Sequence, residues 1–86
     1  MKTFTVFRPA VPTDSHNEDQ RNDPDKPQFQ GVIFDSGKCV LSWLTAVESI
    51  SVYDSFDDMI RIHGHPEYGS YLVWDDGWVV KLGDLK

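Results

Sequence analysis

The chain has 86 residues, 26% of them charged, and a formal net charge of −6. This length suits one domain, residues 1–86, and the excess of acid argues against direct binding to nucleic acid, which depends on Lys and Arg. The single Cys39 excludes an internal disulfide, and its alternating apolar surroundings predict a buried side chain. No run approaches the ~20 apolar residues of a membrane span, so a cytoplasmic protein is expected.

The first third of the chain combines one strand with a long polar segment. Residues 1–7 alternate polar and apolar side chains, which predicts a strand. Residues 9–27 contain four prolines and almost no large apolar side chain, which predicts a flexible loop or one that a partner orders. Arg8 and Arg21 could clamp such a partner.

Two short turns predict two hairpins. They are Asp35-Ser36-Gly37-Lys38 and Asp75-Asp76-Gly77-Trp78, each between apolar, β-branched and aromatic runs. Read as two-residue turns at Ser36-Gly37 and Asp76-Gly77, they pair Phe34 with Cys39 and place Trp78 on the face of Tyr71. Both hairpins then carry apolar side chains on both faces, which favours a homodimer over a lone monomer.

A further strand and a helix lie between the hairpins. Residues 49–53 predict a strand half buried through Ile50 and Val52. Residues 54–64 predict a helix of about two turns, capped by Asp54 or Ser55 and ended by a left-handed Gly64. Its spacing directs Phe56, Met59, Ile60 and His63 to the sheet and Asp57, Asp58 and Arg61 to solvent. The fold class is therefore α+β, a small antiparallel sheet of about five strands with one short helix on one face.

Three groups of residues suggest chemistry or binding. His63 and His65, with acidic residues nearby, could ligate a metal, although a helix end and a loop start explain them more simply. The aspartates have local roles at a helix start and in turns, and could also form a negative surface. The aromatic rings are core, interface or binding anchors. No catalytic residue and no cofactor is predicted; the predicted binding residues are Trp78, Tyr71, Trp74, Asp57, Asp58, Asp75, Asp76 and Arg61.

The order of residues from Gly31 to Asp75, with a hairpin that leads to Trp43, a short helix and His63-Gly64-His65, resembles a group of small uncharacterised phage and actinobacterial proteins. This resemblance implies a phage or mobile-element context. Because no catalytic constellation is found and both hairpins are apolar on two faces, we expect a non-enzymatic protein of the host cytoplasm that inhibits a defence system, in the manner of an anti-CRISPR, by blocking a host protein such as a nuclease. An oligomeric sponge for a nucleotide signal, with Lys81, Lys38 or Arg61 meeting its phosphate, is the alternative. A metal-dependent enzyme using His63 and His65 is a second alternative.

Overall fold

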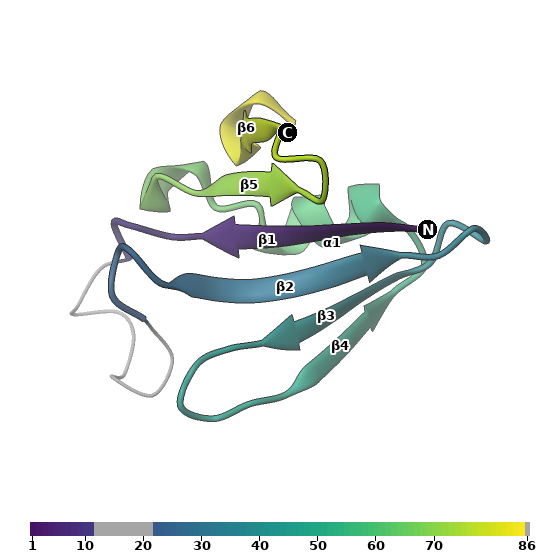
Figure 1. The fold of residues 1–86 in the computed structure, drawn as a ribbon, viewed down its shortest axis with the longest axis horizontal. Helices are drawn as coiled ribbons and strands as arrows, with labels where there is room; N and C mark the ends of the chain where they lie inside the picture. The colour runs from purple at the N-terminus through teal and green to yellow at the C-terminus, as the bar shows by residue number, and fades with distance from the viewer. Residues whose placement is uncertain (12–21, 86) are drawn as a thin grey trace.

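The computed structural model describes residues 1–11 and 22–85, and these residues form one antiparallel sheet with a helix on one side (Figure 1). The six strands of the described residues lie in the order β4-β3-β2-β1-β5-β6. The elements are β1 (Lys2–Phe7), β2 (Pro27–Ile33), β3 (Cys39–Trp43), β4 (Ile50–Tyr53), α1 (Phe56–His63), the 3₁₀ turn η2 (Pro66–Tyr68), β5 (Tyr71–Trp74), β6 (Val79–Lys81) and the 3₁₀ turn η3 (Leu82–Asp84).

The predicted α+β class is confirmed, but the sheet has six strands and not about five. The N-terminal strand, the two hairpins and the strand before the helix all join the same sheet. Strand β1 lies between the hairpins, where Thr5 is opposite Gln30 of β2 and Val73 of β5. The first strand of the chain is therefore the central link of the fold.

The predicted register of both hairpins is wrong by one residue, for the same reason. Ile33, not Phe34, is opposite Cys39, and Val73, not Trp74, is opposite Val79. Each turn has three residues and ends in a glycine with positive φ, +93° at Gly37 and +89° at Gly77. A type I turn followed by such a glycine is the usual three-residue hairpin loop, and the added residue moves every later side chain to the other face.

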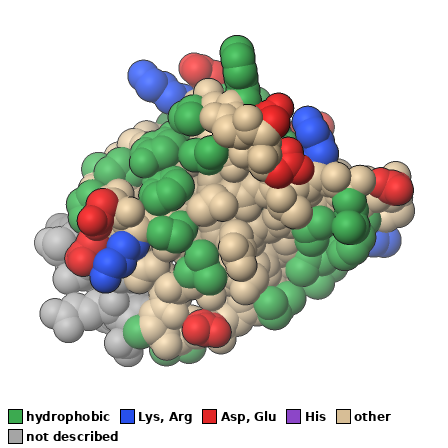
Figure 2. All heavy atoms as spheres, viewed as in Figure 1, with side chains coloured by type: hydrophobic (Ala, Val, Ile, Leu, Met, Phe, Trp, Pro, Cys, Tyr) green, Lys and Arg blue, Asp and Glu red, His purple; other side chains and the backbone are tan. Residues whose placement is uncertain are grey.

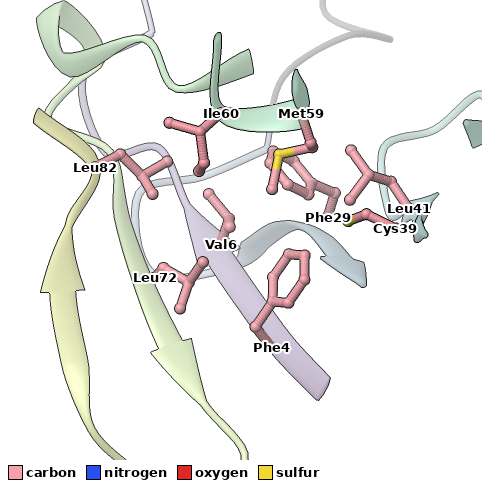
Figure 3. Close-up of a cluster of buried hydrophobic side chains, with 9 residues drawn as sticks. All are labelled: Phe4, Val6, Phe29, Cys39, Leu41, Met59, Ile60, Leu72 and Leu82. Carbon is pink, nitrogen blue, oxygen red and sulfur yellow. The ribbon is translucent and has the colours of Figure 1, made fainter. Parts of the chain in front are cut away.

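The core lies between α1 and one face of the sheet. Nine hydrophobic residues are buried there (Figure 3): Phe4, Val6, Phe29, Cys39, Leu41, Met59, Ile60, Leu72 and Leu82. Figure 3 shows Met59 and Ile60 of the helix pointing at the strands. Gly31 leaves room for this packing, because a Cβ there would lie 2.4 Å from the ring of Phe4. The predicted buried position of Cys39 is confirmed.

The predicted caps of the helix are confirmed at its N-terminal end only. The Ser55 hydroxyl accepts a hydrogen bond from the backbone N–H of Asp58, as predicted for an N-cap. Gly64 has φ −76°, so the predicted left-handed cap is wrong. A Cβ at Gly64 would lie 2.4 Å from the Ile60 carbonyl oxygen, so close approach of the backbone explains this glycine.

The opposite face of the sheet carries no covering element among the described residues, and Figure 1 looks on to it with α1 behind. We call it the open face. Ile50 and Val52 belong to it and are 65% and 66% exposed, so their predicted half burial is wrong. By strand register its thirteen residues are Thr3, Thr5, Phe7, Gln30, Val32, Val40, Ser42, Ile50, Val52, Tyr71, Val73, Val79 and Lys81.

The predicted loop 9–27 is only partly within the described residues, since positions 12–21 lie outside them. Its two ends are held by hydrogen bonds. The backbone N–H of Ala10 donates to the Tyr68 carbonyl at 2.9 Å. The Asn22 side-chain amide donates to the carbonyls of Pro27 at 2.8 Å and Leu44 at 2.9 Å.

Candidate binding surfaces

Acidic side chains gather at the end of the sheet where β1 begins. The antiparallel order brings both hairpin turns and the β4–α1 connection to this end. We call it the acidic end; its carboxylates are Asp35, Asp54, Asp57, Asp58, Asp75 and Asp76. Asp35 lies 2.7 Å from the N-terminal ammonium, which lowers the pKa of this carboxyl, and Asp54 lies 3.1 Å from the Lys38 ammonium. The four predicted binding aspartates are thus brought to one end of the molecule.

Trp78 stands exposed at the acidic end. Its side chain, 70% exposed, follows the turn in which Asp75 and Asp76 lie. The turn is held by hydrogen bonds, because the Asp75 carboxylate accepts one from the backbone N–H of Thr3 at 3.1 Å and Asp76 accepts one from the N–H of Trp78 at 3.0 Å. The structure therefore offers an exposed indole directly after a turn that hydrogen bonds hold in place and that carries two carboxylates.

Trp74 has a different setting from Trp78. It is half-buried on the covered face, where its ring centroid lies 5.4 Å from that of Phe56 and 5.8 Å from that of Phe4. The Lys2 ammonium lies 4.6 Å from the Trp74 ring centroid. Trp74 therefore packs the start of the helix against the sheet, and its indole lies at the edge of the core.

Tyr71 lies at the far end of β5, on the open face. Its ring stacks on Phe7, with centroids 5.1 Å apart and planes at 9°. Lys81 is opposite Tyr71 in the sheet, and both line a hollow of about 570 Å³ that also includes Val79. The structure does not bring Tyr71 together with Trp78, because the length of β5 separates them.

The charged residues of the helix lie on its outer side. The Arg61 side chain is 79% exposed, and its guanidinium is 3.9 Å from the carboxylate of Asp58. Asp57, Arg61 and Leu85 share a shallow depression there. Arg61 is therefore on the opposite side of the sheet from Tyr71.

The two histidines have different partners. His63 forms a hydrogen bond with the Tyr53 hydroxyl and packs against Trp43. Burial, together with the nearby Arg8 and His65, lowers its pKa from 6.5 to about 4. His65 Nδ1 is 2.8 Å from the Glu67 carboxylate and its ring stacks on Tyr68. In residues 1–11 and 22–85, no three His, Cys, Asp or Glu side chains are grouped closely enough to hold a metal ion.

Arg8 is a residue whose place the sequence reasoning missed. The expectation that Arg8 clamps a partner is wrong, since only 5% of it is exposed, and Arg21, named with it, lies outside the described residues. Its guanidinium carbon lies 5.2 Å, 5.4 Å and 5.6 Å from the ring centroids of Phe29, Trp43 and Tyr68. Burial lowers the pKa of Arg8 to about 10. A signal was present, because position 8 continues the inward alternation of Phe4 and Val6.

These features define a class, a small single-sheet α+β protein with one covered face, one open face and an acidic end. The chain belongs to the Acb5 phage protein family, whose model matches residues 29–76, which is 48 of the 86 residues. The predicted resemblance to small phage proteins is thereby confirmed. No curated protein and no solved structure matches the chain.

The matched range extends from Phe29 in β2 to Asp76 in the last turn. It includes α1, His63-Gly64-His65 and the two turn aspartates, while β1, Trp78 and β6 lie outside it. In the described part of the chain, no helix has the length and apolar character needed to cross a membrane.

Proposed function

We propose that this phage protein is a non-enzymatic binding protein that inhibits a host defence system by blocking a host protein, such as a nuclease, through the acidic end. The observation that carries the proposal is Trp78, 70% exposed beside Asp75 and Asp76. An exposed tryptophan beside carboxylates would complement the basic groove in which a nuclease binds nucleic acid.

The chemistry of the acidic end supports this role. Tryptophan is among the residues most often found as binding anchors, and it gains most when the partner removes it from water. Carboxylates around it raise the rate of encounter with a basic surface. Because hydrogen bonds from Thr3 and Trp78 already hold the turn, little order is lost when it binds.

The surroundings of the two histidines support a metal-dependent enzyme less than the acidic end supports a binding protein. His63 is engaged by Tyr53 and Trp43, whereas His65 is engaged by Glu67 and Tyr68. Each imidazole thus has a structural partner of its own. Elemental analysis of the purified protein for zinc and manganese tests this alternative directly.

Phage plating on hosts that each carry one defence system tests the proposal. A phage expressing the wild-type protein should plate better on at least one such host. Trp78→Ala should remove most of this gain, because it deletes the anchor but no core contact. Val47→Ala is the matched control, since Val47 is 64% exposed in the β3–β4 loop and outside the acidic end. Full protection by Trp78→Ala would contradict the proposal.

A binding measurement with the purified target of that defence system follows. The complex should weaken with rising salt, and Asp75→Asn with Asp76→Asn should reduce both the association rate and its salt dependence. A complex unaffected by salt and by these substitutions would show that the acidic end is not the contact surface.

The nucleotide sponge is a second candidate, favoured by one observation. Tyr71 and Lys81 border a hollow of about 570 Å³, a size suited to a small ligand, and they offer an aromatic face and a cation. Heat-denatured protein should then release a compound with nucleobase absorbance, and the ligand should raise the melting temperature of wild type but not of Lys81→Ala. Protein blockade predicts neither result.

A further inference from the structure

The open face lacks the charges of the rest of the chain. Lys81 is the single charged side chain among its thirteen residues, whereas 26% of all residues are charged. Figure 2 shows green hydrophobic side chains on both sides of an uncharged middle, with most acidic and basic groups toward the outline. A sheet face that meets water in a monomer is normally polar, so this composition indicates that something covers it.

We propose that the open face is the interface of a homodimer, covered by the same face of a second copy. Each copy has a net charge of −6, so copies repel wherever their carboxylates meet. The open face is where they can approach with the least repulsion, because its six strands contribute no carboxylate to it. The same lack of carboxylates makes it a poor complement for a basic host protein.

The shape of the open face suits another sheet. Eight of its residues are β-branched valine, isoleucine or threonine, whose short side chains allow a second sheet to pack at ~10 Å. A hollow of about 670 Å³ lies over β1 and β2, with Thr5 and Gln30 among its lining residues. Phe7 lines the same hollow, and its ring stacks on that of Tyr71. A twofold interface brings the same patch of both copies together, so the aromatic rings of one copy can lie against the hollow of the other.

The size of the fold also favours a second copy. One helix of eight residues covers one face only, and Ile50, Val52 and Val79 of the open face are 65%, 66% and 57% exposed. Domains of this length commonly gain stability by oligomerisation because a single small core supplies little. The acidic end lies at the end of the strands, so a face-to-face dimer leaves both Trp78 side chains accessible. The dimer does not depend on the proposed function.

Molar mass by light scattering at several concentrations tests the interface. Wild type should have twice the chain mass of 9.8 kDa. Gln30→Glu, at an exposed central position, should weaken the dimer at least ~10-fold, because it opposes two like charges in a desolvated interface. Ile62→Glu is the matched control, since Ile62 is 56% exposed on the helix side of the sheet, and it should leave the mass unchanged.

Cross-linking provides a second test of the interface if the Gln30→Glu variant folds poorly. Cys39 is buried, so a cysteine introduced at Gln30 or Ile62 is the accessible thiol in each variant. A short bismaleimide should join two copies through Gln30→Cys and not through Ile62→Cys. A wild-type monomer at high concentration would overturn the proposal. A dimer that Gln30→Glu leaves intact would also overturn the proposal, and it would indicate pairing of the β4 edges of two copies.

Discussion

Arg8 Nη2 donates a hydrogen bond of 2.7 Å to the carbonyl oxygen of His63. The contact connects the residue after β1 with the last residue of α1, 55 positions further along the chain. Carbonyl groups in the last turn of a helix lack a partner within the helix and carry partial negative charge, so they favour a cation. This one bond therefore holds the helix end against the central strand.

Replacing Arg8 with alanine should lower the free energy of unfolding by ~3 kcal/mol, since it removes the hydrogen bond, the ring contacts and the buried aliphatic stem together. Urea unfolding followed by circular dichroism at one protein concentration measures the change. Arg61→Ala is the control, because its exposed pair with Asp58 should be worth less than ~1 kcal/mol. Equal losses in the two variants would contradict the role given to Arg8.

The lowered pKa of His63 predicts a pH dependence of stability. Its pKa falls from 6.5 in the unfolded chain to about 4 in the folded protein, so the unfolded state binds the proton more readily between these values. Stability should be complete above pH 6.5 and decrease as the pH falls toward 4. Allowing for the screening of a half-buried group, the loss due to His63 should be about 1–2 kcal/mol.

Unfolding measured at pH 7 and pH 5 in wild type and His63→Gln checks this slope. The variant keeps a polar group for Tyr53 but cannot titrate, so its stability should change less over this range. His65→Gln, which alters the exposed pair with Glu67, should keep the wild-type slope. A slope that depends on His65 instead would refute the assignment.

The glycine at the end of each hairpin turn should tolerate asparagine but not valine. Gly77 has φ +89°, and a Cβ there would meet nothing within 4 Å, so only the backbone conformation is at stake. Gly77→Val should cost ~1–2 kcal/mol and Gly77→Asn clearly less, because asparagine enters the left-handed region more easily. Thermal unfolding of both variants measures the difference; equal costs would mean that the turn changes its type.

Cys39 should be inert in the folded protein. Burial raises the pKa of its thiol to about 11, and the side chain has no exposed surface. A thiol reagent at pH 8 should react with it at the rate at which the protein opens, and at once in denaturant. Rapid reaction of the native protein would show that the β3 end of the core is open.

The sequence predicted the elements well because their signals are local. The Ser55 cap depends only on the first turn of the helix. The inward direction of Met59 and Ile60 depends only on their spacing along the helix. The hairpins were found for the same reason. Their register was not, since Gly37 and Gly77 each suit both a two-residue and a three-residue turn, and only pairing with a third strand selects between them.

The predicted binding residues show the same difference between local features, which the sequence predicts, and their arrangement in space, which it does not. The exposed side chains of Asp57, Asp75 and Trp78 could be predicted from a helix start and a turn. That they share one end of the molecule, while Tyr71 lies at the other, depends on the strand order. Arg8 could be placed on the inner side by alternation, but its contacts with Trp43 and His63 come from strands and a helix far away in the chain.

By itself, then, the sequence determined the α+β class, the N-cap of the helix, the positions of the two hairpin turns, the buried cysteine and the acidic balance, because each depends on neighbours within a few residues or on composition. Only the tertiary structure decided that β1 lies between the hairpins, that Arg8 is enclosed by rings and that one face of the sheet is open. These depend on which strands pair, and pairing is set by the burial of side chains that are distant in sequence.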